Sequence, residues 1–166
     1  MKLTDLLERL DYTLAGAQDI EREITSIEQD SRKIKAGSLF IAVRGTNVDG
    51  HSFIPQVIED GAAAVVCDTL PEELSDNVTY IKVEDCNLAL AMLASAWNGY
   101  PSEQLTLVGV TGTNGKTTIA TLLYRLFTKL GYPCGLLSTV CNYVIDREVP
   151  ATHTTPDPLQ LNNLLR

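Results

Sequence analysis

The stretch that decides the fold runs from Leu105 to Thr118 and reads LTLVGVTGTNGKTT. Its apolar first part, Leu105–Val110, predicts a buried strand. A glycine-rich loop follows, and helical spacing then runs from about Thr117 to Leu130 and ends at Gly131. This order of strand, glycine-rich loop and helix is the context in which phosphate-binding loops occur, and it predicts the start of a parallel nucleotide-binding sheet.

The residues of this loop suit a nucleotide phosphate. Glycines allow the backbone to fold tightly around an anion, and the start of a helix adds partial positive charge. Lys116 would place a cation on the β- and γ-phosphates, and the Thr117 hydroxyl would ligate Mg²⁺. The common spacing needs glycine where Val110 stands, so an ordinary glycine-rich turn is the alternative. The predicted ATP-binding residues are Gly112, Thr113, Asn114, Gly115, Lys116, Thr117 and Thr118, with Lys116 as the catalytic residue and Thr117 as the metal ligand.

Strand-like and helix-like segments alternate along the chain, which predicts an α/β fold. We expect strands at 39–43, 62–67, 79–83 and 134–139, and helices at 3–10, 52–60, 88–97 and from 157 onward, the second of them capped by Ser52. Gly and Pro in the segment 98–102 indicate a linker, so we expect one domain over 1–100 and a second that begins at 101. Residues 103–166 supply about two strands, fewer than the about 4–6 of a typical sheet. We therefore expect the chain to be the N-terminal portion of a longer protein.

Composition narrows the class of protein. The 166 residues carry 13 Lys and Arg against 21 Asp and Glu, a net charge of −8, which argues against a nonspecific nucleic-acid binder. There is no signal-peptide pattern, and no apolar run approaches the about 18 residues of a membrane span, so we expect a cytoplasmic protein that does not insert into membranes. The four cysteines form no CxxC pair and are interpreted as buried free thiols rather than zinc ligands.

Three parts of the sequence, the second made of three short segments, resemble the Mur ligase family, cell-wall enzymes that join amino acids to a UDP-sugar. Gly112–Thr118, GTNGKTT, is similar to the family's phosphate loop, although folate polyglutamate synthetases carry a related loop that tends to end in Gly-Ser. Asp30–Lys33, Gly37–Gly45 and Asp49–Phe53 look like the N-terminal UDP-binding domain shared by the third and fourth ligases of the pathway. Thr154–Asp157, TTPD, looks like the motif of the third ligase.

The resemblance implies a function for the whole protein. It implies an N-terminal UDP-substrate-binding α/β domain at 1–100 and the beginning of a parallel-sheet ATP-binding domain at 101–166. The reaction would add a diamino acid, expected to be meso-2,6-diaminopimelate, to UDP-N-acetylmuramoyl-L-alanyl-D-glutamate through an acyl-phosphate, with ATP and Mg²⁺. The family resemblance also implies a monomer that takes part in peptidoglycan synthesis, and we expect residues 1–166 alone to be inactive.

The same resemblance assigns substrate residues. Ser31 would hydrogen-bond the UDP part of the substrate, and Thr46, Asn47 and Val48 fall where the next loop lines the uridine pocket. Thr154 and Thr155 would hold the muramoyl-peptide end, beside His153, where the family often has Asn. The alternatives are the fourth ligase, which adds D-Ala-D-Ala, a folate-type ligase, and a UDP-sugar-binding module that has lost ATP chemistry.

Overall fold

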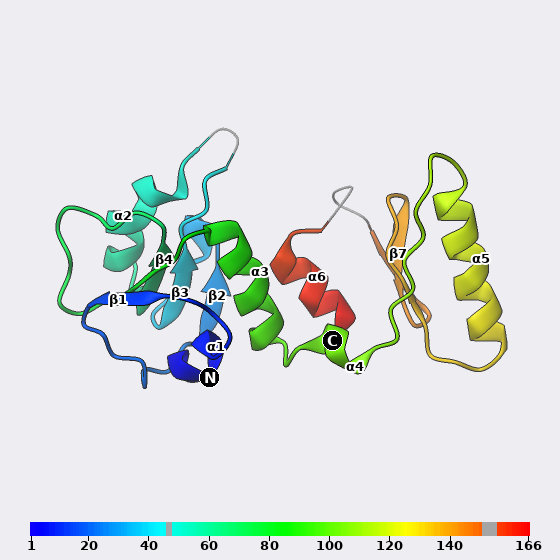
Figure 1. Ribbon diagram of the computed structural model, residues 1–166, viewed down its shortest axis with the longest axis horizontal. Helices are drawn as coiled ribbons and strands as arrows, with labels where there is room; N and C mark the ends of the chain where they lie inside the picture. The colour runs from blue at the N-terminus through cyan, green and yellow to red at the C-terminus, as the bar shows by residue number, and fades with distance from the viewer. Residues whose placement is uncertain (46–47, 151–155) are drawn as a thin grey trace. The chain divides into compact units, whose positions relative to one another are not determined.

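The computed structural model describes residues 1–45, 48–150 and 156–166. These residues divide into two units, 1–99 and 100–166, each with its own helices and strands (Figure 1). The α/β class predicted from the sequence is confirmed, and the mostly parallel sheet lies in the first unit.

The first unit is built on a five-stranded sheet in the order β1-β5-β4-β3-β2. Strands β2 to β5 are parallel to their neighbours, and β1 lies antiparallel to β5 at the edge. The elements of this unit are α1 (Leu3–Leu7), β1 (Thr13–Gly16), β2 (Ser26–Glu28), the 3-10 helix η1 (Ser31–Lys33), β3 (Ser38–Ile41), the 3-10 helix η2 (Gly50–Phe53), α2 (Ile54–Glu59), β4 (Ala64–Cys67), β5 (Thr79–Lys82) and α3 (Cys86–Trp97).

The two central strands carry the core. Every residue of β3 and β4 is buried, as expected for parallel strands that are covered on both faces. Phe40, Val65 and Tyr80 point to one face, where they form a cluster with Ile54 and Val57 of α2. Because side chains alternate along a strand, the residues between them face the opposite side, and α3 packs against β2 and β4.

Acidic residues just before the helices decide where those helices begin. The side chain of Asp49 accepts a hydrogen bond from the backbone N–H of His51 at 2.9 Å and so caps η2, from which α2 continues. The expected cap, Ser52, instead donates its hydroxyl to the carbonyl oxygen of Asp49 at 2.7 Å, so the prediction of Ser52 as the cap was wrong. Helix α3 likewise starts at Cys86, two residues earlier than expected, because Asp85 caps it.

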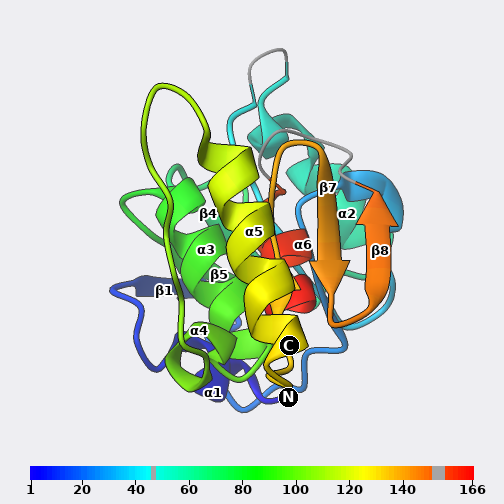
Figure 2. The same ribbon diagram turned by 90° about the vertical axis from the view of Figure 1, so that its right-hand side faces the viewer.

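The second unit contains α4 (Pro101–Gln104), α5 (Lys116–Lys129), β6 (Gly135–Leu136), β7 (Cys141–Val144), β8 (Arg147–Pro150) and α6 (Pro158–Leu165). Helix α5 ends before Gly131, whose φ of +88° favours glycine, and α6 is capped by the side chain of Asp157, so both helices predicted here are confirmed. The β7–β8 hairpin lies beside α5 (Figure 2), where the rings of Tyr124 and Tyr143 stack with centroids 5.2 Å apart.

The strands of the second unit differ in detail from the expectation. Residues 105–110 carry no strand, and Leu107 and Val108 are 60% and 70% exposed. A strand needs a hydrogen-bonded neighbour, and no strand of the described residues lies beside this segment. The expected strand at 134–139 shortens to β6, which pairs antiparallel with β7.

Candidate functional site

The loop before α5 adopts a conformation that leaves its amides open. Gly115 precedes the helix with a φ of +76°, a left-handed conformation that glycine adopts without strain. No side chain caps the first turn of α5, so its N–H groups have no side-chain acceptor within the described chain. Apart from the adjoining backbone, no heavy atom of the described residues lies within 4 Å of the position where a Cβ of Gly115 would stand, so there is space beside the helix start.

Lys116 folds back over this loop. Its Nζ donates to the carbonyl oxygen of Gly112 at 2.5 Å and lies 3.5 Å from that of Thr113. The ammonium group is therefore held at the loop by two backbone carbonyls. A positive charge and N–H groups without a side-chain cap, both within this short segment, are the donors that an oxyanion requires.

Thr117, the expected metal ligand, lies on the first turn of α5. Its side chain lines a cavity of about 380 Å³ between α5 and the strand β7, together with Arg125, Ser138 and Tyr143. Thr113, Asn114 and Thr118 are exposed. The loop amides, the ammonium group of Lys116 and the hydroxyl of Thr117, with free space beside Gly115, are groups that suit a magnesium nucleotide.

Ser31 lies at the carboxyl-terminal edge of the sheet in the first unit. It begins η1, three residues after the end of β2. The turn is shaped by Asp30, whose Oδ1 accepts the backbone N–H of Arg32 at 3.1 Å and whose two oxygens accept its guanidinium at 2.8 and 2.7 Å. The Ser31 hydroxyl makes no hydrogen bond within the described part of the chain. It is half-buried and available to a ligand.

The pairing with Arg32 changes the acid–base behaviour of Asp30. Its pKa falls from 3.8 to about 2, first because the Arg32 guanidinium donates to the carboxylate and further because the Arg32 backbone N–H does so. The Ser31 turn is thus held by an ionised carboxylate over the whole neutral range.

The loop after β3 reaches the same edge. The carboxyl ends of parallel strands meet at one edge of a sheet, which is where ligands of such folds bind. Val48 lies in this loop and is 53% exposed. Thr46 and Asn47, and also His153, Thr154 and Thr155, lie outside the described residues, so their predicted contacts stay predictions.

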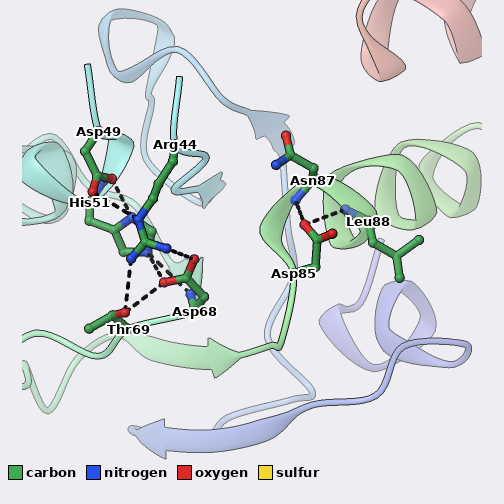
Figure 3. Close-up of polar contacts among 8 residues, drawn as sticks. All are labelled: Arg44, Asp49, His51, Asp68, Thr69, Asp85, Asn87 and Leu88. Carbon is green, nitrogen blue, oxygen red and sulfur yellow. Dashed lines mark hydrogen bonds and ion pairs between the residues drawn. The ribbon is translucent and has the colours of Figure 1, made fainter. Parts of the chain in front are cut away.

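A polar cluster joins the two loops that follow β3 and β4. Arg44, Asp49, His51, Asp68 and Thr69 form this cluster, which we call the edge network (Figure 3). Arg44 donates to Asp49 at 3.3 Å, to Asp68 at 2.6 Å and to the Thr69 hydroxyl at 3.2 Å. The sequence alone assigned no individual role to Arg44, His51 or Asp68. The available signal was that Asp68 directly follows a buried strand and that Arg44 lies three residues after the end of another.

One corner of the network resembles a metal cluster. Possible ligand atoms of His51, Asp68 and Cys86 all lie within 4.8 Å of one another. The backbone N–H of Asp68, however, already donates to Nε2 of His51 at 3.4 Å. Burial also raises the pKa of the Cys86 thiol to about 12. Because Nε2 of His51 is engaged by this amide and a protonated thiol is a poor metal ligand, we describe this corner as a polar cluster.

Comparison with known proteins decides the family. Residues 23–98 match the model of the Mur ligase family catalytic domain, and residues 110–166 match that of the Mur ligase middle domain. The chain belongs to the Mur ligase family.

Curated relatives and a solved structure agree with this. The chain is 52% identical to the UDP-N-acetylmuramoyl-L-alanyl-D-glutamate–2,6-diaminopimelate ligase of Bacteroides fragilis and 54% identical to that of Parabacteroides distasonis, in each case over 99% of the chain and 34% of the relative. It thus spans about a third of the length of these Mur ligases. A solved structure of a ligase with the same name has a TM-score of 0.69 and 25% identity, and covers 99% of the chain and 32% of that protein.

The fourth ligase of the pathway has a similar fold. The UDP-N-acetylmuramoylalanyl-D-glutamyl-2,6-diaminopimelate–D-alanyl-D-alanyl ligase of Acinetobacter baumannii matches with a TM-score of 0.58 and 25% identity, over 78% of the chain and 28% of that protein. No helix of the described residues is long and apolar enough to cross a membrane.

Proposed function

We propose that this chain supplies the UDP-substrate site and the phosphate loop of a ligase that adds 2,6-diaminopimelate to UDP-N-acetylmuramoyl-L-alanyl-D-glutamate at the expense of ATP. The observation that carries the proposal is the loop before α5, with its uncapped amides, its left-handed Gly115 and the Lys116 ammonium above the turn. The curated relatives that share 50–56% identity with the chain carry this ligase name, which supports the choice of substrate.

Each residue has a proposed task. The amides of Gly112–Thr118 and the Nζ of Lys116 hold the terminal phosphates of ATP and offset the negative charge that develops during phosphoryl transfer. The Thr117 hydroxyl holds Mg²⁺, which when bound neutralises phosphate charge. Ser31 donates to the UDP part of the second substrate, and Val48 packs beside it, together with the expected contacts of Thr46 and Asn47. His153, Thr154 and Thr155 orient the muramoyl-peptide end. We further propose a monomeric, cytoplasmic enzyme.

Lys116→Ala tests the phosphate site. We would replace the matching third of the Bacteroides fragilis ligase by residues 1–166 and measure ADP release that depends on both the UDP-muramoyl-dipeptide and diaminopimelate. Removal of the ammonium group is expected to lower the rate by at least about a hundredfold, because preorganised charge on the transferring phosphoryl group is lost. Lys129→Ala, in the last turn of the same helix, is the matched control and should keep the rate.

The outcomes separate the alternatives. Activity that survives Lys116→Ala would refute the phosphate-loop assignment. A chain of residues 1–166 that binds the UDP-muramoyl-tripeptide much more tightly than the dipeptide in calorimetry would favour the fourth ligase. A chimera that binds the dipeptide but releases no ADP would favour a binding module.

A further inference from the structure

The edge network ties together two loops that leave the same edge of the sheet. Arg44 follows β3, and Asp68 and Thr69 follow β4 directly. The guanidinium of Arg44 reaches across to both, and its Nε also donates to Asp49. A guanidinium presents its donors in a fixed planar fork, so three acceptors on two loops restrict where the Arg44 backbone can lie.

His51 makes a second tie between the same segments. Its Nδ1 lies 2.7 Å from Oδ1 of Asp49, and its Nε2 accepts the backbone N–H of Asp68 at 3.4 Å. Nε2 also lies 3.3 Å from Oδ1 of Asp68, and the side chain is only 13% exposed. The imidazole therefore spans the gap between the start of η2 and the end of β4.

The stretch between these ties is closed at its base. Arg44 and Asp49 form an isolated antiparallel bridge, and the Gly45 N–H donates to the carbonyl oxygen of Val48 at 3.0 Å. Gly50, which follows Asp49, packs so closely on the backbone before Arg44 that a Cβ would lie 2.6 Å from the carbonyl oxygen of Val43. The exposed Val48 therefore lies between two anchored residues, Arg44 and Asp49, and both of these belong to the edge network.

We propose that Arg44 and His51 are positioning residues for UDP recognition: through Asp49 and Asp68 they fix the exposed residue Val48 at the carboxyl-terminal edge of the sheet. This inference rests on the proposed UDP site. Arg44 acts through Asp68 and Asp49 rather than through the phosphates of the ligand, because three of its donors are already engaged by the protein.

A series of ligands with increasing phosphate number tests this role. Calorimetry would compare the 166-residue chain with Arg44→Gln, His51→Leu and Asp68→Asn, using uridine, UMP and UDP. Each variant is expected to bind all three ligands about tenfold more weakly, by the same factor for each. The reason is that a displaced loop weakens contacts with the uridine group, which all three ligands share. The double variant Arg44→Gln with Asp68→Asn should lose less affinity than the sum of the two single losses, because both substitutions remove the same Arg44–Asp68 contact.

Thermal unfolding of each variant accompanies the binding data. Lys2→Gln, which removes the same charge and breaks the exposed ion pair with Glu21, is the control and should leave binding unchanged. A loss for Arg44→Gln that grows from uridine to UDP would mean direct phosphate contact and would overturn the proposal. Unchanged affinities with a lowered melting temperature would also overturn it. If the unmodified chain binds none of the three ligands, the proposed UDP site itself fails.

Discussion

Asp30 and Arg32 form a pair two residues apart that braces the Ser31 turn. The carboxylate accepts two guanidinium hydrogen bonds and one backbone hydrogen bond, which lowers its pKa to about 2. A carboxylate whose pKa is lower in the folded chain than in the unfolded chain stabilises the fold only while it is ionised. The pair therefore contributes in full above the ordinary pKa of 3.8 and ceases to contribute as the pH falls through about 2.

Asp30→Asn is expected to lower the free energy of unfolding at pH 6, and the difference from the unmodified chain should shrink between pH 4 and pH 2. The effect is modest because Arg32 is exposed, and added salt should reduce it. Urea unfolding across this pH range measures it. Glu72→Gln, in an exposed loop, removes the same charge and should show no such convergence. A difference that stays constant down to pH 2 would contradict the role given to Asp30.

Local chemistry explains which site residues could be predicted. The loop of Lys116 and the turn of Ser31 are each one short continuous segment, and the residue types in such a segment indicate its backbone conformation. Arg44 and Asp68 lie 24 residues apart, and their contact depends on the register of β3 against β4, which hydrophobic patterns do not reveal. The contacts of the edge network therefore could not be predicted from the sequence and became visible only in the structure.

At the scale of elements, one carboxylate starts α3. Asp85 Oδ1 accepts the backbone N–H groups of Asn87 at 2.7 Å and Leu88 at 3.2 Å (Figure 3). These are two of the donors that a helix leaves unsatisfied at its N-terminus. The helix covers one face of the sheet, and Leu93 at its centre is fully buried, so its start affects the stability of the first unit.

Asp85→Ala is expected to destabilise the first unit by about 1 kcal/mol, the usual cost of losing a side-chain cap. Asp85→Asn should recover most of this, because an amide oxygen also accepts from these amides. Urea unfolding followed by circular dichroism measures both variants. Glu84→Ala, one residue earlier and also exposed, provides the comparison, and an equal loss in that variant would argue against capping.

Most elements of the first unit were predictable, because β3, β4 and β5 are short apolar runs between polar turns. The strands β1 and β2, at the two edges of the sheet, were not predicted, because they are short and mostly half-buried, so their patterns are weak. The second unit held a further difference. The apolar run at 105–110 has strand chemistry, but strand formation is decided by a neighbour and not by the run itself.

At the scale of the whole molecule, the cysteines divide between the two units. Cys67 and Cys86 of the first unit are buried, and burial raises the pKa of their thiols to about 11 and about 12. Cys134 and Cys141 of the second unit are half-buried. Because the thiolate is the reactive form, the two units carry thiols of different accessibility and reactivity.

Labelling with a thiol reagent at pH 8 should therefore proceed in two phases. The thiols of the second unit are expected to react first, and those of the first unit only as that unit unfolds. Mass spectrometry of peptides identifies the labelled residue at each time. The variant with Cys134→Ser and Cys141→Ser should lose the early phase, and early labelling of Cys67 would show that the first unit opens more readily than its burial indicates.

The open surroundings of Gly115 have a stereochemical consequence. A side chain at this position is disfavoured by the left-handed backbone, whose φ is +76°. It is not disfavoured by steric contact, because no described atom outside the adjoining backbone would meet a methyl group there. L-Alanine would oppose the backbone, whereas D-alanine, introduced by chemical ligation, prefers this half of conformational space. The mirror-image residue should therefore rigidify the entrance to α5 while leaving every amide in place.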